Sequence, residues 1–325
     1  MLFPKEKKAE TGMKGLELAR DFYESCGKPM LEKNFPQVLP YIAAGLFGSG
    51  SECFGYDDEI SRDHDFEPCF CLLLPGENIV DRRTAFLLER AYAKLPGEFK
   101  GFRRTQILPV GGARHGVLRT EEVFQNKTGT PDGNLTLKQW LSLPDHYLAE
   151  AVNGEIFYDG YGEVTRIRRR LAFYPEDIRR KKLAGHLLLM AQAGQYNYLR
   201  SVRRGENAAA QMAVFEYVKS GIETVFLLNR KYQPYYKWAF RAMRELPLLP
   251  DLADDFEMMI TRGNDEEAAE EKSAVIERIS RDVIRILGEQ RLSSAPSDEL
   301  ERHAYIVNDS IRDSEIRNLH VLAGV

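Results

Sequence analysis

The strongest constraint on the fold is a change in hydrophobic pattern near the middle of the chain. Up to about residue 165, short apolar runs are separated by turns rich in Gly, Pro and Asp, which is typical of strands alternating with helices. Beyond Pro175 the apolar residues recur only at helical spacing. Runs of strands followed by runs of helices predict an α+β fold, with a mixed-sheet domain over residues 1–165 and an all-helical bundle over residues 166–325.

The pattern also predicts the individual elements. In the first domain we expect helices over 15–26, 80–95 and 120–124, and strands over 41–47, 64–74, 105–110, 115–120 and 155–158. In the second we expect helices over 178–201, 207–229, 235–246, 252–262, 266–290 and 298–319.

Charge and composition exclude several classes of protein. The 325 residues include 45 Lys and Arg against 49 Asp and Glu, a formal net charge of −4, so no global basic field attracts nucleic acid. The basic runs that begin at Arg166 and Arg179 are typical of solvated helix faces, and RNA stays a minor alternative. The motifs of P-loop, Rossmann, zinc-protease and serine-hydrolase enzymes are missing from the sequence.

Apolar runs and cysteines indicate the compartment. No run approaches the roughly 18 apolar residues that a membrane helix needs, so we expect a cytoplasmic protein with no membrane partner. No CxxC spacing occurs, and we expect reduced, buried thiols at the four cysteines, Cys26, Cys53, Cys69 and Cys71.

The most informative motif is a Gly-Ser turn followed by two aspartates. The turn that contains Gly48, Ser49 and Ser51 follows an apolar strand, and glycine there lets N–H and hydroxyl donors approach phosphate closely. Asp63 and Asp65 are spaced i, i+2, so on a strand both carboxylates face the same side and can bind one divalent cation. The two halves of the motif therefore predict phosphate and metal binding at one sheet edge.

These residues carry a family resemblance. Phe47-Gly48-Ser49, thirteen intervening residues and Asp63-His64-Asp65-Phe66 resemble the signature of the nucleotidyltransferase superfamily that shares its palm with DNA polymerase β. The rest of the chain is similar to a bacterial family of uncharacterised nucleotidyltransferases, related to kanamycin- and lincosamide-modifying enzymes, with a helical C-terminal domain. The stretches that carry this second resemblance are 115–117, 154–160, 172–177 and 228–238.

The resemblance implies a reaction. It implies magnesium-dependent transfer of a nucleoside monophosphate, AMP from ATP, to a hydroxyl of a small molecule. Asp63 and Asp65 would hold Mg²⁺, and Gly48, Ser49 and Ser51 would cradle the nucleotide phosphates. Transfer to a tRNA or protein acceptor, or a non-catalytic regulatory protein that binds nucleotide, are the alternatives.

A third carboxylate usually completes such a site, and its position is open here. The expected strand 115–120 contains no Asp or Glu. Glu121, Glu122, Glu155 and Asp159 are the candidates, with Glu122 and Asp159 the possible metal ligands. The first two also suit the first turn of a helix, and Asp159 also suits a turn.

Three further features have two interpretations each. Segment 229–238 holds three cations and four aromatics, which suits either packing between helices or a triphosphate contact through Arg230 and Lys237. By alternation His64 faces away from the aspartates and is expected to pack or to support the site. His115 opens a strand next to the presumed site, where it could contact phosphate or substrate or simply complete a hydrogen-bonded strand end.

Overall fold

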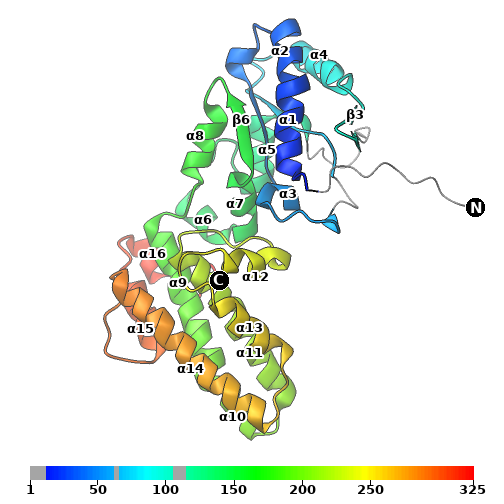
Figure 1. Ribbon diagram of the computed structural model, residues 1–325. Coiled ribbons are helices and arrows are strands. Elements are labelled where there is room, and N and C mark those ends of the chain that lie inside the picture. The colour runs from blue at the N-terminus through cyan, green and yellow to red at the C-terminus, as the bar shows by residue number, and fades with distance from the viewer. Residues whose placement is uncertain (1–11, 62–65, 105–114) are drawn as a thin grey trace, which may run out of the picture. The chain divides into compact units, whose positions relative to one another are not determined.

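The computed structural model describes residues 12–61, 66–104 and 115–325 (Figure 1). The structure is α+β and 60% helical, with a mixed four-stranded sheet, which confirms the predicted α+β class and the mixed sheet. The chain divides into two compact units, the first Met1–Leu135 with Tyr147–Ala172, and the second Thr136–His146 with Phe173–Val325. The boundary that we predicted at residue 165 falls inside a helix of unit 1, and the second division falls inside helix α7 (Asp145–Val152).

The sheet of unit 1 brings four strand ends to one edge. Its order is β5-β2-β1-β6, with β1 antiparallel to both neighbours and β2 parallel to β5. The register pairs Gly45 with Cys71, Cys71 with Gly116, and Leu46 with Glu155. The end of β1 therefore lies beside the starts of the other three strands: β1 (Ala43–Leu46), β2 (Cys71–Leu74), β5 (Gly116–Arg119) and β6 (Glu155–Asp159).

Helices cover both faces of this sheet. On one face, Leu72 and Leu74 pack in a core with residues of α1 and α4, including Phe22 and Tyr92. Cys71 and the Leu118 side chain point to the other face, because side chains alternate along a strand, and α5 follows β5 there. Unit 1 also has a hairpin, β3 (Glu98–Phe99) and β4 (Phe102–Arg103), and these helices: α1 (Gly15–Phe22), π-helical η1 (Tyr23–Gly27), α2 (Lys28–Asn34), 3-10 helix η2 (Leu39–Tyr41), α3 (Ser51–Phe54), α4 (Arg82–Ala93), α5 (Thr120–Thr128) and α8 (Glu163–Arg170).

All of the regular secondary structure in the described residues of unit 2 is helical. Its central helix α9 is buried on nearly every side, including the charged Lys181. Lys181 Nζ donates to Asn308 Oδ1 (2.8 Å) and to the carbonyl of Leu319 (2.7 Å), which ties α9 to the end of the chain. The helices are α6 (Leu137–Ser142), α9 (Glu176–Met190), π-helical η4 (Ala191–Tyr198), α10 (Leu199–Arg203), α11 (Asn207–Leu228), α12 (Tyr236–Arg244), α13 (Leu252–Thr261), α14 (Glu266–Glu289), α15 (Leu300–Asp309) and α16 (Ser314–Asn318).

The strand predicted over 64–74 is shorter than expected. In the described residues it begins only at Cys71. The Tyr92 hydroxyl donates to the Phe70 carbonyl (2.8 Å) and accepts from the Phe70 N–H (3.1 Å), so a side chain takes the place of a strand partner for this N–H, while the Phe70 carbonyl also accepts the Gly116 N–H (3.0 Å). Pro68 also has no N–H to donate. The strand predicted over 105–110 lies outside the described residues.

The predicted helices also differ from the observed ones in two ways. The helix predicted over 298–319 is interrupted, because the Asp177 carboxylate accepts the N–H groups of Arg312 (3.1 Å) and Asp313 (2.9 Å) and Asp313 then caps α16. The short helices α6, α7 and α8 were not predicted. In the described part of the chain, no helix combines the length and apolar character needed to cross a bilayer.

A cluster of charged groups is enclosed in unit 2. Asp145 accepts hydrogen bonds from the Tyr174 hydroxyl (2.7 Å) and from Lys182 Nζ (3.3 Å), and Lys182 also donates to the carbonyl of Gly324 (3.0 Å). Burial, reinforced by the negative charge of Asp145, raises the pKa of Glu223 to about 8. Lys182 and Lys219 oppose this rise but do not cancel it.

The raised pKa predicts a pH dependence of stability. Because folded Glu223 holds its proton at higher pH than the unfolded chain does, the free energy of unfolding should fall as pH rises from about 4.5 to 8, by up to ~1.4 kcal/mol per pH unit. In urea unfolding, the Glu223→Gln variant should lack this fall in the free energy of unfolding with rising pH. It should also be more stable than wild type at pH 8. The exposed Glu301→Gln serves as control. Equal pH profiles for Glu223→Gln and wild type would contradict the assignment.

Candidate functional site

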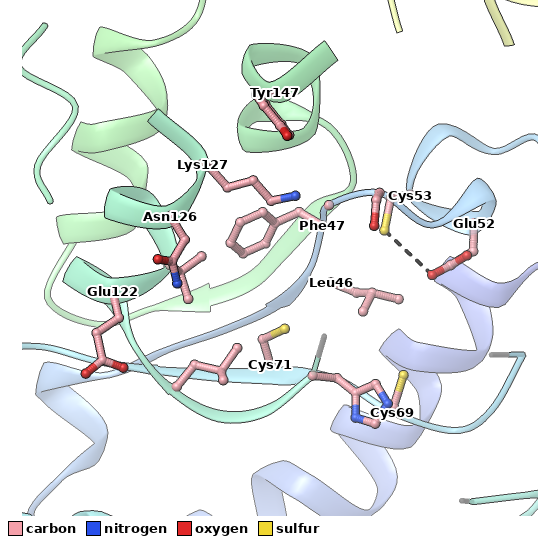
Figure 2. Close-up of a pocket in the computed structure, with 15 residues that line it drawn as sticks. Leu46, Phe47, Glu52, Cys53, Cys69, Cys71, Glu122, Asn126, Lys127 and Tyr147 are labelled. Atoms are coloured by element: carbon pink, nitrogen blue, oxygen red, sulfur yellow. Dashed lines mark hydrogen bonds between the residues drawn. The ribbon is translucent and has the colours of Figure 1, made fainter. Parts of the chain in front are cut away.

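A cavity of about 480 Å³ lies at the sheet edge where β1 ends and β2 and β5 begin (Figure 2). All of its lining residues belong to unit 1. They come from the turn after β1, from α3, from the starts of β2 and β5, from α5 and from α7: Leu46, Phe47, Gly48, Ser49, Glu52, Cys53, Cys69, Cys71, His115, Leu118, Glu122, Val123, Asn126, Lys127 and Tyr147.

The Gly-Ser turn is held in place by one side chain. The Gly48 N–H donates to Asn153 Oδ1 (2.9 Å), and Asn153 Nδ2 donates back to the Gly48 carbonyl (2.8 Å). Gly48 has φ +125°, where a residue with a Cβ is strained. Gly48 is therefore required for its conformation, and its N–H is engaged by Asn153 rather than offered to a phosphate. Of the other turn residues predicted to bind phosphate, Ser49 lines the cavity, whereas Ser51 begins α3 and is not part of the lining.

Three buried thiols form part of the wall. Cys53, Cys69 and Cys71 all line the cavity, and each is at most 5% exposed. Cys53 Sγ donates to Glu52 Oε1 (3.9 Å), as Figure 2 shows. Burial raises the pKa of the Cys69 thiol well above its ordinary value, so this thiol stays protonated near neutral pH and is a poor nucleophile.

A histidine and a glutamate pair at the start of β5. His115 Nε2 lies 2.7 Å from Glu67 Oε1, and the Glu67 side chain is only 8% exposed. When the ring is neutral, this contact places the proton on Nε2 and leaves Nδ1 as a hydrogen-bond acceptor. His115 Nδ1 is buried and has no hydrogen-bond partner among the described residues. Both interpretations of His115 are thus compatible with its position, since it completes a strand start and also lines the cavity.

A second ion pair lies across α5 and α7. Lys127, in the last turn of α5, pairs with Glu150 of α7. The Lys127 side chain is 25% exposed and that of Glu150 is 8% exposed. Figure 2 shows Lys127 extending across the cavity toward Phe47 and Tyr147.

The predicted metal ligands are only partly within the described structure. Asp63 and Asp65, with His64 between them, lie outside the described residues. Within the described ranges, no group of three or more His, Cys, Asp or Glu side chains is arranged to hold a metal ion. Glu122 lines the cavity, whereas Glu121 does not.

The other two carboxylate candidates do not line the cavity. Asp159 pairs with Ala43 at the start of β1, a full strand length from the turn that follows Leu46, and its carboxylate accepts the Thr165 N–H (2.7 Å). Glu155 pairs with Leu46 but forms an ion pair with Arg20 of α1 on the opposite sheet face. Neither Glu155 nor Asp159 lines the cavity, and their role as metal ligands stays a prediction.

The cations predicted from segment 229–238 both belong to unit 2. Arg230 Nη1 lies 2.8 Å from Glu176 Oε2, and its guanidinium lies over the Phe173 ring at 5.3 Å. Lys237 Nζ lies over the Trp238 ring at 5.3 Å. Neither residue lines the cavity, and a carboxylate of the same unit already balances Arg230. Their contact with a triphosphate stays a prediction.

Sequence reasoning missed several residues of the cavity wall and also Glu67, which does not line the cavity but pairs with His115. Glu67 continues the two-residue spacing of Asp63 and Asp65, a signal that was present in the sequence. Asn126 and Lys127 lie on α5 beyond the point where we expected that helix to end. Glu52 lies on the short helix α3, which has no clear periodicity.

Comparison with known families locates one match. Residues 140–239 match the model of a family described as a domain of unknown function, DUF4037. The match contains Tyr147 of the cavity wall and the supporting residues Glu150 and Asn153, but neither the Gly-Ser turn nor the two aspartates. A search of curated proteins gives no match.

The clamp on Gly48 generates a prediction. Asn153→Ala removes both hydrogen bonds to the Gly48 backbone and should lower the free energy of unfolding by about 1–3 kcal/mol, because buried polar groups lose their partner. Urea unfolding measures the change, with Asn134→Ala in an exposed loop as control. If Asn153→Ala is as stable as the control, the clamp does not hold the turn.

Proposed function

We propose that the protein is a magnesium-dependent nucleotidyltransferase that transfers AMP from ATP to a hydroxyl of a small molecule. The observation that carries the proposal is the cavity beside the Gly48–Ser49 turn at the end of β1. Only three residues separate Asp65 from Cys69, which lines this cavity. The sequence order of the turn, the aspartates and the next strand thus agrees with the cavity's position in the fold.

The donor set suits magnesium. Mg²⁺ prefers oxygen ligands and usually takes one or two carboxylates together with water and substrate phosphates. Asp63 and Asp65 would hold the ion, and Glu122 is the carboxylate from the earlier candidates that lines the cavity. When bound, the ion neutralises phosphate charge and polarises the phosphoryl oxygens.

The chain's own groups would perform the remaining tasks. The Ser49 hydroxyl, in the wall next to Gly48, would donate a hydrogen bond to a phosphate oxygen. His115, held through Nε2 by Glu67, would accept the proton of the attacking hydroxyl at Nδ1. The clamp by Asn153 would keep the turn fixed while the phosphates bind, which favours a well-defined geometry for transfer.

Pyrophosphate release from ATP tests the proposal. With magnesium and a panel of small hydroxyl compounds, wild type should release pyrophosphate, and Asp63→Asn or Asp65→Asn should lower the rate at least ~100-fold, about 2.7 kcal/mol of transition-state stabilisation. Glu122→Gln should lower the rate less severely. Glu121→Gln is the matched control, since it is adjacent on α5 but outside the cavity wall.

Two results would contradict the proposal. One is wild-type turnover in either aspartate variant, which would mean that these carboxylates do not support the chemistry. The other is a wild-type protein that neither binds ATP nor releases pyrophosphate with any acceptor. Circular dichroism of each variant confirms that lost activity does not reflect lost fold.

A further inference from the structure

The Lys127–Glu150 ion pair is largely buried beside the cavity. Both side chains are largely withdrawn from water, at 25% and 8% exposed. Removing two charges from water costs free energy that their mutual attraction only partly offsets, so such a pair is weak evidence for a stabilising role. Lys127 lines the cavity and Glu150 lies behind it, which points to a role in binding.

Lys127 is also the cation best placed to meet an anion in this cavity. The basic side chains in the described lining are Lys127 and His115. The His115 Nε2 atom is engaged by Glu67, and a neutral ring offers no charge to an anion. The Lys127 ammonium has three N–H donors, and Figure 2 shows the side chain extending toward Phe47 and Tyr147.

We propose that Lys127 is the phosphate-binding cation of the cavity and that Glu150 is its positioning residue. In the free protein Glu150 holds the ammonium at the wall and balances its charge. A polyphosphate chain, which carries several negative charges, then takes up the remaining donors and competes with the single carboxylate. That the polyphosphate belongs to a nucleotide rests on the proposed function, whereas the anion site itself does not.

The proposal predicts different changes in polyphosphate affinity when each of the two residues is substituted. Lys127→Met removes the cation and should weaken polyphosphate binding about 10- to 100-fold, the usual effect of losing one charge-assisted phosphate contact. Glu150→Gln removes the competing carboxylate but keeps the side chain's shape, so binding should be at least as tight as in wild type. A purely structural ion pair would instead weaken binding in both variants, because either change disturbs the same wall.

Calorimetric titration of the full chain tests this inference. Inorganic tripolyphosphate and ATP are titrated separately without magnesium, so that the aspartates and their ion do not contribute. Lys28→Met is the matched control, because Lys28 pairs with Glu24 on the exposed surface of the same unit (3.1 Å) and should not affect binding. The double variant Lys127→Met/Glu150→Gln leaves no unpaired buried charge, so it should fold even if Lys127→Met does not, and it too should bind weakly.

Each outcome decides one claim. Wild-type tripolyphosphate affinity in Lys127→Met or in the double variant overturns the inference, as does weakened binding in Glu150→Gln. If wild type binds ATP but Lys127→Met binds it equally well, the inference fails while the proposed function stands. If wild type binds tripolyphosphate through Lys127 but does not bind ATP even when the titration is repeated with magnesium, the inference stands and the proposed function fails. If wild type binds neither anion without magnesium, the inference fails, and the proposed function fails with it only if ATP does not bind with magnesium either.

Discussion

The site depends on the close approach of the loop before β6 to the end of β1. Asn153 holds both backbone groups of Gly48, and the Gly154 N–H donates to the Cys53 carbonyl (2.9 Å). A Cβ on Gly154 would lie 2.1 Å from the Leu46 carbonyl oxygen, so only glycine allows the two segments this close. Arg168 of α8 in turn donates to the carbonyl of Asn153. Hydrogen bonds therefore connect the Gly-Ser turn, helix α3 and the loop before β6 to one another.

The family match acquires a structural meaning from these contacts. Residues 140–239 supply little of the cavity surface, but they include Asn153, Glu150 and Arg168. These three side chains hold, respectively, the Gly-Ser turn, the Lys127 ammonium and the loop that carries Asn153. The matched segment thus supports a site whose proposed chemistry comes mainly from residues before it in the chain.

Sequence predicted the parts of the fold that local pattern determines. The strand at β1, the helix at α4 and the long helices of unit 2 have clear periodicity, and the Gly-Ser turn marks the cavity. The late start of β2 was not predictable, because it depends on a hydrogen bond from Tyr92, more than twenty positions away. The pairing of Asp159 with Ala43, at the start of β1, was not predictable either, because strand register is a tertiary property. Lys127 was missed because its importance comes from Glu150, a partner on another helix.

The most direct test of the account is a crystal structure of the full chain with a non-hydrolysable ATP analogue and magnesium. The account predicts the triphosphate in the cavity between Ser49 and Lys127, with magnesium bound by Asp63 and Asp65. A nucleotide bound elsewhere, or a magnesium ion in the cavity that neither aspartate contacts, would contradict it.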